Sequence, residues 1–193
     1  MILSVNPLSP STITALLRLD IDDVYPLISS VHSLFILQGD VDHPVRPFHY
    51  SFPNFLTDST RCVNSRFHVP PDQHTELLVS CLELMNQKLK KNMCELPEGV
   101  CNSEVKDLRE RMEKHIDQAL QYSCRSWHTH LIDMTPDQAL QIIPVLHQFL
   151  EKKFLFWLDV LSVLGVARVA VNALEVTVKW LDVRYILPPI NFK

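Results

Sequence analysis

The sequence contains few side chains whose type and spacing could carry chemistry, and the most distinctive of them is His49. It lies in the stretch VRPFHYSFPNFLTD (45–58), where it is surrounded by four aromatic side chains, Phe48, Tyr50, Phe52 and Phe55. An imidazole near neutral pH can donate a hydrogen bond to an anion, or it can pack in a protein core. The residue types alone leave both roles open for His49. Phe48, Phe52 and Phe55 are predicted to be core residues in either case.

Other histidines and cysteines are poorly spaced for a metal site. Cys62, His68 and His74 are spread over a connecting segment, and His128 and His130 form a pair without a CxxC or HExxH motif. A zinc site needs ligands that converge on one point, whereas helical residues two positions apart point to different sides. We therefore predict no metal site. Cys–His catalysis stays open, although no local motif supports it.

Composition argues against several classes of function. The chain has 193 residues, of which 47% are hydrophobic and 21% charged, and its formal net charge is −4. These values describe a globular protein with a substantial core. Only 3 glycines are present, and neither GxxxxGK(S/T) nor GxGxxG occurs. The chain therefore carries no phosphate-binding loop of its own, and we expect no cofactor in it.

Cysteine usage and hydropathy indicate the compartment. The five cysteines are odd in number and irregularly spaced, and the first residues show no signal-peptide pattern. This is typical of reduced, mostly buried thiols in the cytoplasm. The most apolar run (154–165) is interrupted by Asp159 and is too short to span a bilayer, so we interpret it as a buried helix.

The first 58 residues follow a recognisable order of elements. Ser9 and Pro10 have the types of an N-cap and a first helical residue, and helical apolar spacing follows over 13–17 and again over 24–31. Residues 33–38 and 45–49 have strand character, separated by a turn-rich segment, 39–44. Two helices followed by a β-hairpin is the winged-helix order, so we predict a winged-helix subdomain over 1–58.

The rest of the chain is predicted to be helical. A connector, 59–70, leads into a helical domain, 71–193, with helices over 71–94, from about 103 through 120, and over 145–165. We expect a capping box at Thr135 and a helix break at Pro144. Cys124, Trp127 and His130 are expected to pack between helices. The predicted fold class is therefore mainly α: a small winged-helix unit of two or three helices plus a β-hairpin, followed by an all-α domain of helical hairpins.

These segments resemble a known family. NPLSPSTITALLRLDIDDVYPLISSVHSLFILQ and HPVRPFHYSFPNFLTD are similar to the winged-helix subdomain of NACHT-type STAND nucleotidases, above all to the NLR-like NACHT proteins of mushroom-forming fungi. LLVSCLELMNQKLKKNMCEL, ALQYSCRSWHTHL and KFLFWLDVLSVLG resemble the helical region that follows the NACHT domain in that family. The resemblance covers nearly the whole chain and is most specific in the first 58 residues.

The resemblance implies a role for His49. In that family a P-loop ATPase core precedes the winged helix, which carries an F-x-H-x-S-F motif whose histidine contacts the phosphates of ADP. His49, Ser51 and Phe52 match the H-x-S-F part of this motif, whereas Phe48 lies directly before His49 instead of two positions before it. The P-loop is missing here, so we expect an internal part of such a protein. His49 would be an inherited ADP contact, and ADP or ATP would bind only if a P-loop core were supplied.

The expected function follows from this resemblance. We expect a non-catalytic regulatory and scaffolding segment that couples the nucleotide state of an ATPase core to downstream domains, with that core or another protein as its partner. One alternative is an autonomous helical interaction module, or a gene remnant without function. A DNA-binding winged helix is a further alternative, but the second helix (20–34) carries three aspartates and no Lys or Arg, which would repel DNA phosphates. We therefore expect neither a nucleic-acid nor a membrane partner.

Overall fold

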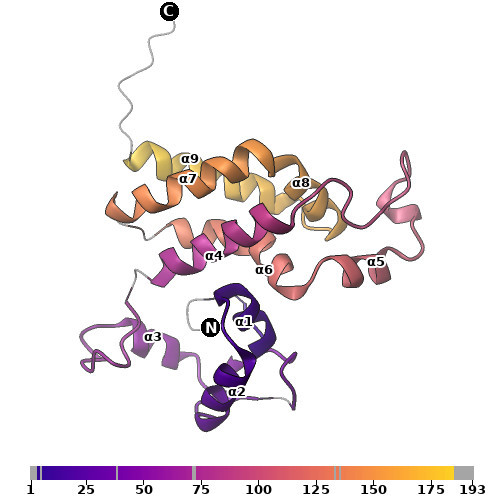
Figure 1. The fold of residues 1–193 in the computed structure, drawn as a ribbon. Coiled ribbons are helices and arrows are strands. Elements are labelled where there is room, and N and C mark those ends of the chain that lie inside the picture. Colours follow the sequence, from indigo (N-terminus) through magenta and orange to yellow (C-terminus); the bar gives the residue numbers. More distant parts are fainter. Residues whose placement is uncertain are drawn as a thin grey trace, which may run out of the picture.

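The first two helices begin at side chains that cap them. In α1 (Pro10–Leu17) the Ser9 hydroxyl accepts a hydrogen bond from the Thr12 backbone N–H at 3.2 Å, as the sequence predicted. Asp20 caps α2 (Ile21–Ser30) in the same way through the N–H of Asp22 at 2.9 Å. The computed structural model describes residues 4, 6–37, 39–70, 73–132, 134 and 136–184. Over these residues it is mainly α, with nine α-helices and one small antiparallel hairpin (Figure 1).

A short hairpin and a third helix follow. Strands β1 (Phe35–Ile36) and β2 (Arg46–Pro47) are antiparallel, with Phe35 opposite Pro47 and Ile36 opposite Arg46. Each strand is two residues long, shorter than predicted, and Pro47 lacks the N–H that a longer ladder would need. Helix α3 (Ser51–Thr57) begins four residues after β2 and contains much of the aromatic stretch.

The helical part is more interrupted than predicted. It contains α4 (Gln73–Lys88), the 3₁₀ turn η1 (Asn102–Glu104), α5 (Leu108–His115), α6 (Gln118–Ser126), the 3₁₀ helix η2 (Trp127–Leu131), α7 (Pro136–Lys152), α8 (Phe154–Val163) and α9 (Arg168–Arg184). The predicted helix over 71–94 ends at Lys88, and the one expected from 103 through 120 is divided between α5 and α6. Pro71 and Thr135, where the helical domain and the capping box were expected to begin, lie outside the described residues.

Pro144 does not break its helix, contrary to the prediction. It lies inside α7, where a proline removes the hydrogen bond to the carbonyl of Leu140, four residues earlier. The Leu140 side chain is 71% exposed, so this carbonyl lies on the solvent side of the helix. The Asn86 amide of α4 also donates to the carbonyl of Val145 at 3.1 Å, which ties this part of α7 to its neighbour.

The core is centred on α4, which packs against α6, α7 and η2 (Figure 1). Trp127, Phe149 and Trp157 are fully buried and meet edge to face, with ring centroids 5.4–6.0 Å apart. Helix α1 packs on α4 and α6, so one cluster of buried side chains includes both the N-terminal elements and the helices that follow. In the described part of the chain, none of the helices combines the length and the apolar character that crossing a membrane requires.

Candidate functional site

The hairpin presents one exposed side. Residues paired across antiparallel strands project on the same side of the sheet, so Ile36 and Arg46 share the outward side. The Phe48 N–H donates to the carbonyl of Leu34 at 2.9 Å, which extends this pairing by one step. We use the name hairpin face for two sets of exposed side chains. The first set lies on the outward side of the hairpin and the second consists of the two residues after Phe48; together they are Leu34, Ile36, Arg46, Phe48, His49 and Tyr50.

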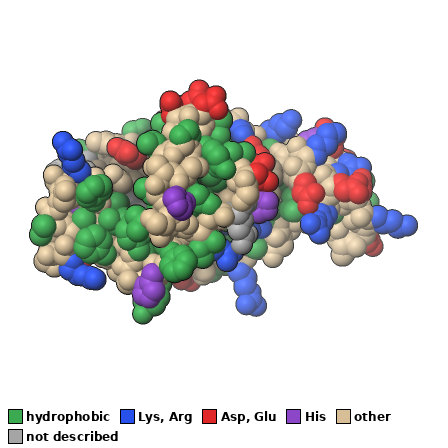
Figure 2. Space-filling model, turned by 90° about the horizontal axis from the view of Figure 1, so that it is seen from below, with side chains coloured by type: hydrophobic (Ala, Val, Ile, Leu, Met, Phe, Trp, Pro, Cys, Tyr) green, Lys and Arg blue, Asp and Glu red, His purple; other side chains and the backbone are tan. Residues whose placement is uncertain are grey.

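Most of the exposed side chains of the hairpin face are apolar or aromatic. Phe48 is 74% and Tyr50 is 80% exposed, whereas Leu34 and Ile36 are each 41% exposed. Figure 2 views the molecule from the side of α1, α2 and α3. Hydrophobic side chains gather over these elements, whereas charged side chains gather toward α5. A contiguous apolar area that is rimmed by polar groups is typical of a protein interaction site.

His49 is held in a defined orientation on this face. Its Nδ1 accepts a hydrogen bond from the Ser51 backbone N–H at 3.1 Å and lies 2.7 Å from the Ser51 hydroxyl. A backbone N–H can only donate, so Nδ1 is the acceptor and the proton of the neutral ring is on Nε2. The ring also stacks on Tyr50, with centroids 4.5 Å apart. His49 therefore offers an Nε2–H donor, for which the described residues provide no acceptor.

The prediction that Phe48, Phe52 and Phe55 are core residues is largely wrong. Phe48 projects from the hairpin into solvent, and Phe55 is 36% exposed. Only Phe52 packs inward, where its ring meets Phe35 edge to face at 5.6 Å. The reason is local: Phe52 lies in the first turn of α3, turned toward the hairpin, whereas Phe48 lies beyond the β2 strand on its outward side.

Arg46 is a functional candidate that the sequence reasoning missed. It lies on the hairpin face, and among the described residues no acceptor pairs with its guanidinium. Alternation along the strand, which places residues 46 and 48 on the same side, is the signal that could have revealed it. Arg46 and His49 together provide donors for an oxyanion beside an apolar surface. Neither side chain could by itself hold a polyphosphate.

Other candidate groups do not form a metal site. His74 and His130 approach each other through their Nδ1 atoms at 3.0 Å, and the His130 Nε2 lies 3.0 Å from the Tyr122 hydroxyl. No group of three or more His, Cys, Asp or Glu is placed to hold a metal ion within the residues described, and Cys62 and His68 join no such group. His130 is 1% exposed, as expected of a residue that packs between helices.

The cysteines are free thiols, four of them buried and Cys101 exposed. Burial raises the pKa of Cys81 to about 12, although the Ser123 hydroxyl opposes this shift. Burial also raises the pKa of Cys124 and Cys94. Because the thiolate is the reactive form, these three side chains are poor nucleophiles at neutral pH.

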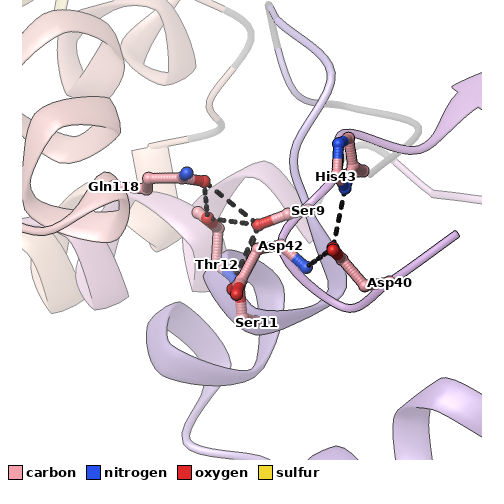
Figure 3. A network of polar contacts seen from close by, with 7 residues as sticks. All are labelled: Ser9, Ser11, Thr12, Asp40, Asp42, His43 and Gln118. Carbon is pink, nitrogen blue, oxygen red and sulfur yellow. Dashed lines mark hydrogen bonds and ion pairs between the residues drawn. The ribbon is translucent and has the colours of Figure 1, made fainter. Parts of the chain in front are cut away.

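Residues 40–43, between β1 and β2, are held together by their own polar contacts. Asp40 accepts a hydrogen bond from His43 at 2.7 Å and another from the Asp42 N–H at 2.9 Å (Figure 3). Both hydrogen bonds lower the pKa of the Asp40 carboxyl, and the bond from His43 has the larger effect. These bonds give residues 40–43 a defined turn between the two strands.

Comparison of the chain with known protein families, with curated proteins and with solved structures finds no match. The geometry of the hairpin face therefore carries the functional argument.

Proposed function

We propose that this chain is the winged-helix and following helical region of an NLR-like NACHT protein. In this role it catalyses nothing itself and acts in the cytoplasm. It docks on a P-loop ATPase core through the hairpin face and couples the nucleotide state of that core to other domains. The observation that carries the proposal is the combination of an oriented His49 Nε2–H, an exposed Arg46 guanidinium on the same hairpin and an exposed apolar surface.

The chemistry of the hairpin face suits a core that holds ADP. A neutral imidazole with its proton on Nε2 donates to a phosphate oxygen without any change of tautomer, and Ser51 keeps the ring in place. Burying a large apolar side chain such as Phe48 contributes about 1.5–3 kcal/mol. Apolar contacts would thus supply most of the docking energy, and His49 would make docking depend on the nucleotide. Loss or change of that contact on exchange for ATP would release the face.

The test uses a protein in which this segment is joined to its ATPase core and carries a fluorescent ADP. We expect His49→Ala to accelerate ADP release about tenfold, because one charge-assisted hydrogen bond is lost. His32→Ala, which removes another exposed histidine, is the matched control and should leave the rate unchanged. An ADP release rate in His49→Ala equal to that of the wild type would contradict the phosphate contact.

A second candidate is favoured by the lack of any phosphate-binding loop in the sequence. In this case the chain is an autonomous interaction module that uses the same apolar face. The two candidates differ in what the isolated chain binds. A module should bind a partner protein with an affinity that ADP and ATP do not alter, whereas the NACHT segment should bind an ADP-loaded core more tightly than an ATP-loaded one.

A further inference from the structure

A cavity lies where α1 meets α6. Its volume is about 290 Å³. A larger cavity of about 810 Å³ adjoins it and shares Thr12, Gln118 and Gln121. The smaller cavity is lined mainly by polar side chains, among them Asn6, Ser9, Thr12, Gln118, Arg125 and Ser126.

Arg125 is the unusual member of this lining. Its Nε–H is buried and has no hydrogen-bond acceptor. Three other helical or turn arginines each pair with a carboxylate at 2.8–2.9 Å, namely Arg18, Arg109 and Arg111. No carboxylate of the described residues pairs with Arg125. Arg125 as a whole is half-buried, but an N–H donor that is buried without a partner is unfavourable, which makes it a group that a ligand would satisfy.

The neighbouring side chains leave further donors on the cavity wall. The Ser9 and Thr12 hydroxyls both donate to Oε1 of Gln118, at 3.2 and 3.1 Å. Figure 3 shows that the amide nitrogen of Gln118 is turned away from these bonds. The amide is therefore oriented by its oxygen, and its N–H groups stay available. The N-terminus of α1, at Ser9, adds a positive partial charge at the same place.

The charge balance selects the class of anion. Among the described residues that line the smaller cavity, Arg125 is the only fully charged cation, whereas Asp42, Glu113 and Asp117 line the adjoining cavity. A dianion would be repelled by these carboxylates more strongly than a monoanion. The planar guanidinium also matches a carboxylate in a two-point hydrogen bond. We propose that this cavity binds the carboxylate group of a small organic monoanion, with Arg125 as its charged contact.

The test follows the Arg125 Nε–H directly by NMR on the full chain. Sodium lactate is the probe, because it combines a carboxylate with a hydroxyl, and sodium chloride at equal ionic strength is the reference. We expect a saturable shift of the Arg125 Nε–H resonance with lactate, accompanied by a rise in Tm. Sodium phosphate at the same ionic strength should cause a smaller response.

Variants separate binding from a general salt effect. Arg125→Met should abolish the lactate-dependent rise in Tm, and Arg125→Lys should weaken lactate binding about tenfold, because it keeps the charge but loses the planar fork. Arg168→Met, which removes an exposed helical arginine, should bind lactate like the wild type. Arg125→Met without ligand should be at least as stable as the wild type, since it removes an unpaired buried donor.

Three results would overturn the proposal. The first is a linear response to lactate that chloride reproduces. The second is an unchanged lactate response in Arg125→Met. The third is a stronger response to phosphate than to lactate, which would exclude the carboxylate assignment.

Discussion

At the scale of single residues, His130 shows how burial sets the charge of a side chain. Both ring nitrogens have neighbours, since Nδ1 lies 3.0 Å from His74 Nδ1 and Nε2 lies 3.0 Å from the Tyr122 hydroxyl. Desolvation, followed by repulsion from His74 and His128, lowers the pKa of His130 from 6.5 to about 4. Desolvation also lowers the pKa of His128, whose Nδ1 is buried without a partner. The folded protein therefore keeps His130 neutral at a pH where the unfolded chain would protonate it.

This difference predicts acid destabilisation in a defined range. Because the unfolded state binds the proton more readily, the free energy of unfolding should fall as pH drops from about 6.5 to about 4, by up to about 3 kcal/mol from His130. Urea unfolding at several pH values measures this. His130→Gln should flatten the profile whatever its stability at pH 7, whereas His32→Gln, at an exposed site, should not. If the free energy of unfolding of the wild type and of His130→Gln depended on pH in the same way, His130 would not be the origin of the acid destabilisation.

At the scale of elements, local caps were predictable but interruptions were not. Ser9 and Pro10 predicted the start of α1 because an N-cap acts within one turn and needs no distant partner. The break between α5 and α6 was missed, since Met112, Ile116 and Leu120 keep a helical spacing across it. Asp117 causes the break: its carboxylate accepts the N–H of Leu120 at 2.9 Å and so starts a new helix.

In the candidate site, too, local contacts were predictable from the sequence and contacts between distant residues were not. The H-x-S spacing pointed to His49 and Ser51, which are close in the chain and make a local contact. The pairing of His74 with His130 joins residues that are 56 positions apart, and only tertiary packing brings them together. The same holds for Arg125, which faces residues of α1. Sequence patterns report local geometry, so they do not predict contacts between residues that are far apart in the sequence.

The role of Asp117 predicts a graded effect on stability. Asp117 caps α6 and also pairs with Lys88 of α4, but both charges are about half exposed, so the ion pair contributes little. Asp117→Ala should lower the free energy of unfolding by about 1 kcal/mol. Asp117→Asn keeps the capping oxygen and should cost clearly less. If urea unfolding gave equal losses for both variants, the charge rather than the cap would be the stabilising feature.

At the scale of the whole molecule, the N-terminal elements are firmly joined to the helices. Buried side chains of α1 belong to the same cluster as those of α4 and α6, and Ser9 and Thr12 bond to Gln118 of α6. The hairpin face should therefore not swing freely relative to the helical part. In the proposed switch, the whole chain would move as one body against the ATPase core, and release of the hairpin face would displace α9 as well.

This arrangement predicts that the hairpin face can be changed without harm to the fold. Phe48 is 74% exposed, so Phe48→Ser should alter the free energy of unfolding by no more than about 0.5 kcal/mol. It should nevertheless lower the binding of a hydrophobic dye and weaken docking on an ATPase core, because Phe48 is the most exposed of the side chains of the face that carry no polar atom. Leu155→Gln on α8 is the matched control, since Leu155 is 70% exposed but lies far along the chain from the hairpin. Docking through this face requires that dye binding and docking fall in Phe48→Ser and not in Leu155→Gln. An equal loss in both variants would show that the hairpin face has no special part in recognition.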